Sequence, residues 1–312
     1  MSHNNAENLK MMIERASIML SLEWNENPRV DAMILLAHAI DIHDYTEMFI
    51  RGFDKINLSE RYIDKFESYI NRRKAGEPIA YIINRKPFWK NDFYINSDVL
   101  IPRPESELLV EYVINISDVV LSGGKSSICD VLELGVGSGC VLISVLNELH
   151  AMALQRQNDI KVRGVGVDIS DGALEVARCN VENILFLPQN VTLLKGNWFD
   201  TENLYHKFDL IISNPPYIPF FEWYKLSKEV KDFEPQISLT DMKDGLEAYR
   251  VISANAKQFL KDKGLIIVEV SYNRATDVIS IFENEGFEVK DIVIDLCNIE
   301  RVVSFMRICV DN

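Results

Sequence analysis

The feature that most constrains the fold is a glycine-rich segment where an apolar run gives way to a helix-like run. Residues 133–139 read Glu-Leu-Gly-Val-Gly-Ser-Gly and close the apolar stretch Ile128–Leu134. Glycine has no Cβ, so the backbone can turn sharply there and approach a ligand closely. From this point the sequence alternates strand-like and helix-like segments. The alternation predicts an α/β domain with a mostly parallel sheet and helices on both faces.

The expected elements of this domain follow one another in regular order. We expect strands at Ile128–Leu134, Val162–Asp168, Val191–Lys195, Phe208–Ser213 and Gly264–Val270, and helices at Ser138–His150, Asp171–Asn180 and Leu246–Lys261. Two further strands, Phe287–Asp295 and Val302–Ile308, are joined by a connection too short for a helical crossover. They should therefore pair antiparallel at one edge of the sheet.

The first quarter of the chain has a different pattern. Residues 7–75 read as helices, with one helix beginning at Asn27-Pro28 and another capped by Ser59. Residues 79–97 alternate aromatic and polar positions and indicate a short hairpin. We therefore expect a helical domain over residues 1–77, a β-hairpin linker over 78–98 and the α/β domain over 99–312.

Composition narrows the classes of partner. The chain has 47 acidic and 33 basic residues and a net charge of −14, which weighs against a duplex-DNA binder that needs a cationic surface. No apolar run reaches the ~18 residues of a membrane span, and the first residues lack the pattern of a secretory signal. Five cysteines without a Cys-x-x-Cys pair fit free thiols in a reducing cytoplasm better than a disulfide framework or a metal site.

Acidic side chains at strand ends predict a ligand site beside the glycines. Glu133 ends the first strand and can hold a cationic amino group, directly or through water. Asp168 ends the second strand, where its carboxylate can accept hydrogen bonds from both hydroxyls of a ribose. Trp198 follows the third strand and can pack on an adenine. The competing interpretations are a plain tight turn, a helix N-cap for Asp168, although Ser170 or Asp171 serves better, and core packing for Trp198 and Phe199.

The motif Asn214-Pro215-Pro216-Tyr217 directly follows the strand Phe208–Ser213. A planar amide or exocyclic amino nitrogen is a poor nucleophile because its lone pair is delocalised. The Asn214 side-chain oxygen can accept one N–H of such a group and the Pro215 carbonyl the other, while Tyr217 offers a flat face. This arrangement would aim the lone pair at a methyl donor. The alternative is a Pro-Pro turn that merely ends a strand.

With these motifs in view, the chain resembles the peptide chain release factor N5-glutamine methyltransferases. The resemblance runs nearly end to end. It includes the segments Asn27–Ala32, Arg72-Arg73, Gly76–Ala80, Phe88-Trp89, Leu100–Glu111, Asn197–Phe199, Asn214–Ile218, Phe233–Pro235 and Asp244–Arg250, besides the glycine-rich turn and Asp168. The Ile-Pro-Arg-Pro-Glu stretch at 101–105 is the most family-specific, whereas Asn-Pro-Pro-Tyr is shared with adenine-N6 DNA methyltransferases.

The resemblance implies a class I S-adenosylmethionine-dependent methyltransferase fold, Rossmann-like with seven strands, behind a small all-helical domain. It implies transfer of a methyl group from S-adenosylmethionine to the glutamine of the Gly-Gly-Gln motif in class 1 release factors, by a cytoplasmic monomer with no metal and no nucleic-acid substrate. The implied cofactor contacts are Gly135, Val136, Gly137, Ser138, Gly139, Asp168, Trp198 and Asn214, beside the Glu133 argued above. The implied acceptor contacts are Asn214, Pro215, Pro216 and Tyr217. Arg72 and Arg73 would help to hold the release factor, or would form a solvated helix end.

The chain departs from the family pattern at a few places. Asn197 stands where an aspartate is usual, and glycines are missing near Ser271 and Cys297. Two rival hypotheses stay open at this point. An adenine-N6 nucleic-acid methyltransferase would flip its base into the same pocket. A binding module would have kept the fold without catalysis, although the intact Asn214, Asp168 and glycines argue against it.

Overall fold

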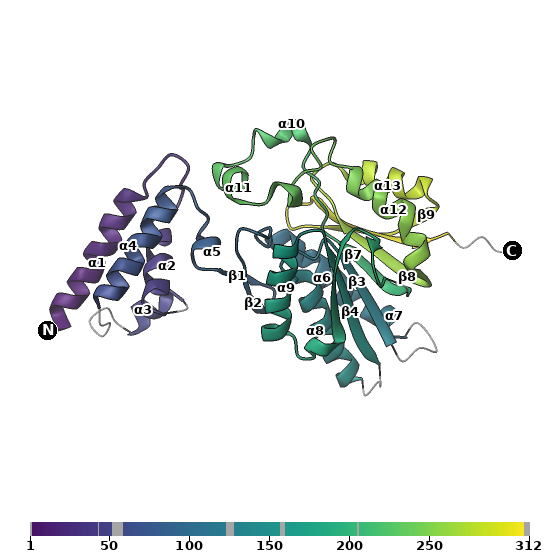
Figure 1. Cartoon of the computed structure of the whole chain (residues 1–312), viewed down its shortest axis with the longest axis horizontal. Helices are drawn as coiled ribbons and strands as arrows, with labels where there is room; N and C mark the ends of the chain where they lie inside the picture. The colour runs from purple at the N-terminus through teal and green to yellow at the C-terminus, as the bar shows by residue number, and fades with distance from the viewer. Residues whose placement is uncertain are drawn as a thin grey trace. The chain divides into compact units, whose positions relative to one another are not determined.

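The computed structural model describes residues 2–42, 44–51, 59–122, 128–156, 160–204 and 206–308. The chain forms two compact units. One comprises residues 1–85 together with 226–233, and the other comprises 86–225 and 234–312. The first unit thus includes a short segment from within the range expected for the catalytic domain. Figure 1 shows the elements of both units.

The first unit is helical, as the sequence predicts. Its helices are α1 (Ser2–Met19), α2 (Pro28–Ala39), α3 (Thr46–Arg51), α4 (Glu60–Lys74), α5 (Ile79–Ile82) and α11 (Lys228–Phe233). Asn27 and Pro28 begin α2 and Ser59 holds the N-cap position of α4, although the Ser59 side chain makes no capping hydrogen bond. Apolar side chains from α1, α2 and α4, including Leu9, Leu35 and Ile70, form a core of their own.

The expectation that the two arginines at the end of α4 face a partner or solvent is wrong for Arg73. Its guanidinium is buried, donates to Asp31 over 2.7 Å and pairs with Glu229 of α11 over 2.6 Å. It also lies 4.7 Å from the ring centroid of Trp24. Arg72 turns to Glu77 instead, with an Nε–Oε2 distance of 2.7 Å. Arg73 is therefore turned into the helical unit, whereas Arg72 stays partly exposed.

The hairpin exists but is shorter than expected. Strands β1 (Arg85–Phe88) and β2 (Asn91–Tyr94) form a two-stranded sheet. Residues 79–82, which we expected in the hairpin, form the helical turn α5. Pro78 precedes this turn at the N-cap position, where a residue without an N–H leaves no helical hydrogen bond unmade.

The second unit is built on a mostly parallel sheet. Its strands are β3 (Ile128–Leu134), β4 (Lys161–Asp168), β5 (Val191–Asn197), β6 (Asp200–Thr201), β7 (Phe208–Ser213), β8 (Leu260–Glu269), β9 (Phe287–Ile294) and β10 (Glu300–Arg307). Their spatial order is β6-β5-β4-β3-β7-β8-β10-β9. The predicted antiparallel pairing of the last two strands is confirmed, with Val303 opposite Ile292. The two-residue strand β6 was not foreseen.

Helices cover the sheet on two sides (Figure 1). The larger ones are α6 (Glu107–Asn115), α8 (Cys140–Gln155), α9 (Asp171–Ile184), α12 (Glu247–Phe259) and α13 (Ala275–Asn284), and the short ones are α7 (Ser117–Ser122) and α10 (Phe220–Trp223), with 3-10 turns at Pro104–Ser106, Pro188–Asn190 and Gln236–Ser238. One core lies between the sheet and α12 and α13, where Phe282 stacks on Phe305 at a centroid distance of 4.1 Å. Among the described residues, no helix is long and apolar enough to cross a membrane.

The strand order decides where a ligand can bind. β3 lies between β4 and β7, so the chain runs outward from β3 in both directions across the sheet. In open α/β sheets, ligands bind at such a switch point, beyond the carboxyl ends of the strands. The glycine-rich turn, Asp168 and Asn214 follow β3, β4 and β7 at this edge. The fold therefore gathers the predicted site residues at one place.

Candidate active site

The glycine-rich turn is held open by positive backbone φ angles. Gly135, Gly137 and Gly139 have φ values of 73°, 50° and 77°, a region that residues with a Cβ rarely adopt. The Gly135 and Val136 N–H groups donate to the Val167 carbonyl of β4 at 2.9 and 3.0 Å. A Cβ on Gly137 would meet nothing within 4 Å. The turn is therefore pinned to β4 on one side and leaves free space above its middle glycine.

Asp168 ties the turn to the next loop. Its Oδ2 accepts from the Gly137 N–H at 2.9 Å and its Oδ1 from the Ser170 N–H at 3.0 Å. Burial raises the pKa of this half-buried carboxyl, and the backbone hydrogen bonds lower it in part. Ser170, and not Asp168, caps α9, since the Ser170 side chain accepts from the Ala173 N–H. Each carboxylate oxygen still has a lone pair for a ligand hydroxyl.

Glu133 is buried beneath the turn. Its Oε2 accepts from the Leu142 N–H in the first turn of α8 at 2.9 Å. Its pKa lies well above the usual range because burial disfavours the charged form, with a smaller contribution from the negative charge of Asp168. A cationic ligand group near Glu133 would offset that cost. The side chain thus has a chemical reason to favour a cation at this place.

A buried amide, Asn180 of α9, joins the hairpin to the turn. Asn180 Nδ2 donates to the carbonyls of Ser138 and Tyr94, both at 2.9 Å, and Asn180 Oδ1 accepts from the Tyr94 N–H at 2.8 Å. The side chain is 1% exposed. Both of its N–H groups and its oxygen are engaged by backbone groups, so we assign it a structural role in fixing the turn. Sequence reasoning did not single it out.

These elements enclose a cavity of about 370 Å³. That volume falls in the ~300–1,000 Å³ range of small-molecule sites. The predicted residues that line it are Glu133, Gly135, Val136, Gly137, Ser138, Asp168, Trp198, Asn214 and Pro216. Gly139, Pro215 and Tyr217 are not among the lining residues. Phe199 belongs to the core and stacks on Phe259. Its neighbour Trp198 lines the cavity, and the Trp198 backbone is left-handed, with a φ of 57°.

The amide of Asn214 is oriented by a serine from a distant segment. Asn214 Nδ2 donates to Ser106 Oγ at 2.9 Å, and Ser106 is 2% exposed. With the nitrogen engaged, Asn214 Oδ1 is left to accept from a ligand. Ser213, one residue earlier, fixes the end of β7 by donating to the Leu134 carbonyl at 2.8 Å. The motif therefore presents an acceptor atom from a strand end that is itself anchored to β3.

Tyr217, the last residue of the motif, is hydrogen-bonded to a buried carboxyl group. The Tyr217 hydroxyl donates to Glu269 Oε1 at 3.2 Å, and the Tyr249 hydroxyl donates to the Glu269 backbone carbonyl at 2.7 Å. Burial raises the pKa of Glu269 to about 7, and the Ser106 and Tyr217 hydroxyls lower it in part. Burial also raises the pKa of Tyr217, with the Glu269 charge adding to the shift. Tyr217 is therefore a neutral hydrogen-bond donor at neutral pH.

A loop from Leu239 to Glu247 braces the chain that follows the motif. Ile218 N–H donates to the Leu239 carbonyl and Phe220 N–H to the Lys243 carbonyl, both at 2.9 Å. Gly245 has a φ of 76°, and a Cβ there would lie well inside van der Waals contact of the Tyr217 carbonyl. The loop thus packs directly on the backbone of the motif.

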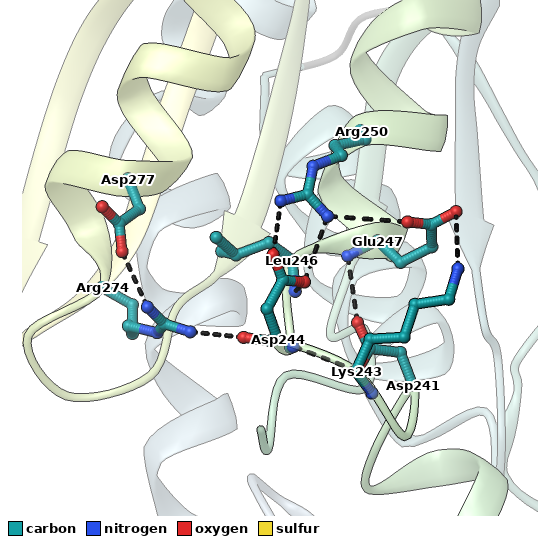
Figure 2. A network of polar contacts seen from close by, with 9 residues as sticks. Asp241, Lys243, Asp244, Leu246, Glu247, Arg250, Arg274 and Asp277 are labelled. Carbon is teal, nitrogen blue, oxygen red and sulfur yellow. Dashed lines mark hydrogen bonds and ion pairs between the residues drawn. The ribbon is translucent and has the colours of Figure 1, made fainter. Parts of the chain in front are cut away.

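Figure 2 shows how charged side chains hold this loop. Asp241 accepts from the Gly245 N–H at 3.0 Å and from the Glu247 N–H at 3.1 Å. Arg250 pairs with Asp244, and Arg274 joins the Asp244 carbonyl to the Asp277 carboxylate. The Arg250 guanidinium lowers the pKa of Asp244 to about 2. The Asp-Gly-Leu-Glu-Ala-Tyr-Arg segment thus supports the motif, and two of its residues, Glu247 and Ala248, also line the cavity.

The Ile-Pro-Arg-Pro-Glu segment, residues 101–105, is held by Glu234 of the Phe-Glu-Pro segment. Glu234 Oε2 accepts from the Ile101 N–H at 3.1 Å and Glu234 Oε1 pairs with Arg103 over 2.5 Å. Arg103, Ser106 and Pro235 all line the cavity.

Sequence reasoning missed Ser106, Glu234 and Glu269 as site residues. For Glu269 a signal was present, because it is the only acid in the apolar run Leu265–Val270. Among the described residues, no cluster of three or more His, Cys, Asp or Glu could hold a metal ion.

Comparison with known proteins places the chain in a family. Residues 12–83 match the profile described as the PrmC N-terminal domain, and residues 125–307 match a methyltransferase domain. A release factor glutamine methyltransferase from Caulobacter vibrioides is 36% identical over 89% of this chain and 89% of its own length. The chain belongs to the release factor glutamine methyltransferase family.

Two other relatives bear on how far the likeness extends. The release factor glutamine methyltransferase of Haemophilus influenzae is 32% identical over 89% of this chain and 91% of its own length. A protein from Rickettsia typhi named as a bifunctional methyltransferase is 36% identical over 96% of this chain. The chain spans only 57% of that protein's length. The two matched family segments, 12–83 and 125–307, lie on either side of the hairpin strands β1 and β2.

Proposed function

We propose that the chain transfers a methyl group from S-adenosylmethionine to the N5 amide nitrogen of the glutamine in the Gly-Gly-Gln motif of class 1 release factors. The observation that carries this is the Asn214 amide, whose nitrogen is engaged by Ser106 and whose oxygen is left as an acceptor beside the cavity. The named function of the family members supports the choice of substrate. A monomeric state, a cytoplasmic location and independence from nucleic acid stay predictions.

The cavity fits the methyl donor in volume and in chemistry. Asp168 has lone pairs for the ribose hydroxyls, and Glu133 favours the cationic amino group. The glycine-rich turn leaves open space at Gly137, and Trp198 lies on the lining where an adenine could stack. When bound, S-adenosylmethionine supplies an electrophilic methyl group on a sulfonium sulfur. Asn197, exposed and on the lining, offers an amide to the donor.

The acceptor side acts by orientation. Asn214 Oδ1 accepts one N–H of the substrate amide and the Pro215 carbonyl accepts the other, which turns the nitrogen lone pair toward the methyl group. Pro215 and Pro216 lack N–H groups, so no competing donor lies next to that carbonyl. A strong base is not required, because the nitrogen becomes acidic as the new bond forms. Positioning of this kind can supply a large part of the rate.

The test is transfer of labelled methyl groups to a class 1 release factor. The purified chain is incubated with methyl-labelled S-adenosylmethionine and either the natural factor or one whose motif glutamine is changed to alanine. Mass spectrometry then locates the label. We expect label on the glutamine amide, absent from the alanine factor and absent with Asn214→Ala, while Asn214→Ala still binds the donor. Label on adenine in DNA, with none on the factor, would contradict the proposal.

A further inference from the structure

Apolar side chains gather on the surface beside the acceptor motif. Helix α10 and the residue after it carry three exposed aromatic side chains, and the chain from 236 to 247 carries two further exposed apolar ones. These five residues, which we call the α10 patch, are Phe220, Phe221, Tyr224, Ile237 and Met242. All five belong to the same compact unit as the acceptor motif. Contiguous apolar surface on a folded chain typically marks a place where another molecule binds.

The α10 patch is one surface because contacts join the two segments that carry it. The Phe220 N–H donates to the Lys243 carbonyl at 2.9 Å, which places α10 against the residue next to Met242. The Phe220 and Tyr224 rings meet edge to face at a centroid distance of 5.6 Å. Gln236 Nε2 lies 3.0 Å from the Met242 sulfur. The patch therefore has its shape before a partner binds, which lowers the entropic cost of binding.

The α10 patch also continues from the lining of the cavity. Ile237 belongs to both, since it lines the cavity and is exposed. Phe220 follows Tyr217, the last residue of the acceptor motif, by three positions, and a Cβ on Gly245 would press on the Tyr217 carbonyl. The patch and the acceptor motif are therefore parts of one continuous surface.

We propose that the α10 patch is a docking surface for the segment of the release factor that flanks the Gly-Gly-Gln motif, and that it binds this segment through apolar side chains. The inference rests on the proposed function, because it assigns a protein acceptor to the cavity next to the patch. It adds residues outside the Asn-Pro-Pro-Tyr motif that recognise the acceptor protein.

A protein acceptor needs contacts beyond the glutamine itself. A specific protein–protein interface buries roughly 800 Å² on each partner, far more than one amide side chain in a pocket supplies. The two glycines before the glutamine have no side chains, so the side chains that fill the patch belong to residues outside the motif. Aromatic residues are enriched in such interfaces, and a few of them supply most of the binding energy. Phe221 and Tyr224, the most exposed members of the patch, fit this role.

The charge around the patch favours a protein segment over a nucleic acid. Proteins that stack bases on aromatic side chains also place cations along the sugar-phosphate backbone. The two segments that carry the patch, residues 220–225 and 236–247, contain four acidic residues (Glu222, Asp241, Asp244 and Glu247) and two basic ones (Lys225 and Lys243). Lys243 lies 3.4 Å from the Glu247 carboxylate. The patch is therefore apolar within acidic surroundings, which disfavours phosphate groups.

The kinetic test compares Phe221→Ser with Phe186→Ser in the full chain. Phe221 is 64% exposed and Phe186, between α9 and β5, is 72% exposed, so both changes remove an exposed phenyl ring. We expect Phe221→Ser to raise the KM for the release factor about tenfold, with kcat and the Kd of the methyl donor within about twofold of the wild type. Phe186→Ser should keep the wild-type KM. An unchanged KM in a Phe221→Ser, Tyr224→Ser double variant, or an equal rise in Phe186→Ser, would overturn the proposal.

Substitutions in the release factor identify the other side of the contact. Apolar residues that flank the motif glutamine are changed to serine one at a time, and the KM is measured with the wild type and with Phe221→Ser. At one position or more, the change should raise the KM of the wild type and have little further effect in Phe221→Ser, because residues in contact are not independent. Effects that multiply at every position would count against the proposal.

Binding without turnover separates this inference from the proposed function. The release factor is titrated into the chain by calorimetry in the presence of S-adenosylhomocysteine. If the wild type methylates no release factor, the proposed function fails, and the docking surface survives only if Phe221→Ser weakens this binding about tenfold. Sedimentation tests a second copy of the chain as the occupant. A dimer of the wild type that is lost in Phe221→Ser would assign the patch to self-association and overturn the proposal.

Discussion

At the scale of single residues, Glu133 combines a cost to folding with a use in binding. Its pKa is raised in the folded chain, so folding costs least at low pH, where the Glu133 carboxyl group is neutral in both the folded and the unfolded state. The stability of the folded state then declines as pH rises above the ~4.3 pKa of an unfolded glutamate. Glu133→Gln keeps an acceptor for the Leu142 N–H and removes the titration. We expect the ligand-free variant to melt at higher temperature than the wild type, with a difference that grows as pH rises from about 5 through neutrality.

Thermal melting across that range checks this directly, and calorimetry with S-adenosylmethionine supplies the counterpart. The variant should bind the donor more weakly, because a neutral amide does not favour a cationic amino group as a carboxylate does. A difference in melting temperature that shrinks as pH rises would show that Glu133 is ionised without penalty. Gains in stability at the expense of binding are common where a site holds an unfavourable group.

Asp168 should be needed for donor binding through both of its roles. Asp168→Ala removes the acceptors of the Gly137 and Ser170 N–H groups and the predicted contact with the ribose. Hydrogen bonds to a charged group contribute ~1.5–3 kcal/mol each, so donor affinity should fall by at least about tenfold. Calorimetric titration measures this. Asp171→Ala is the matched control, since Asp171 is exposed and pairs with Lys195 at the surface, and the donor affinity of this variant should not change.

Single residues were predictable where a ligand-facing pattern lies within one short segment. The glycine-rich turn, Asp168 and Asn214 stand out in the sequence and line one cavity. Ser106 and Glu234 did not stand out, because each acts on a segment more than a hundred positions away, as the hydrogen bonds from Asn214 to Ser106 and from Ile101 to Glu234 show. Such pairs depend on the register of the folded chain, which local spacing does not contain.

At the scale of elements, the loop around Gly245 is predicted to be essential to the acceptor motif. Gly245→Ala adds a Cβ against the Tyr217 carbonyl and forces a left-handed φ on alanine, which costs ~1–2 kcal/mol by itself. Gly286→Ala is the matched control, with a similar φ of 73° but only the flexible end of Lys257 nearby. Both variants should melt lower than the wild type. Only Gly245→Ala should also lose most of its methyl transfer, and equal activities would contradict a direct role of the loop.

The elements themselves were largely predictable from periodicity. Strands β3 and β7 begin and end at the predicted residues, because each is a mainly apolar run that stops at a distinctive motif, the glycine-rich turn after β3 and Asn-Pro-Pro-Tyr after β7. The prediction that residues 79–82 belong to the hairpin was wrong, because an alternating pattern over four residues also fits one helical turn. The two-residue β6 has no pattern to detect. It forms because Trp198, with its left-handed backbone, turns the chain back onto the end of β5.

At the scale of the whole molecule, Arg73 connects segments that are far apart in sequence. It binds Asp31 of α2 and Glu229 of α11 from its position in α4. α11 follows the Asn-Pro-Pro-Tyr motif along the chain, yet it belongs to the helical unit. Gly76, with a φ of 102°, lies near the Phe233 ring and adds an apolar contact to the same junction. The helical unit is therefore completed by residues from the middle of the catalytic sequence.

Removal of Arg73 should loosen all three helices together. Arg73→Ala leaves the buried Asp31 carboxylate and the partly exposed Glu229 carboxylate without this partner. Removing one partner of a buried pair typically costs ~3–5 kcal/mol, to which the Asp31 pair contributes most. Hydrogen exchange read by mass spectrometry should then rise in α2, α4 and α11, and the KM for the release factor should rise more than the Kd for the methyl donor. Arg72→Ala is the control, because its pair with Glu77 is partly exposed and joins residues five apart, so α11 should exchange as in the wild type. Unchanged hydrogen exchange of α11 in Arg73→Ala would mean that the Arg73–Glu229 pair does not hold this helix. The place of α11 in the helical unit would then depend on the apolar contact at Phe233.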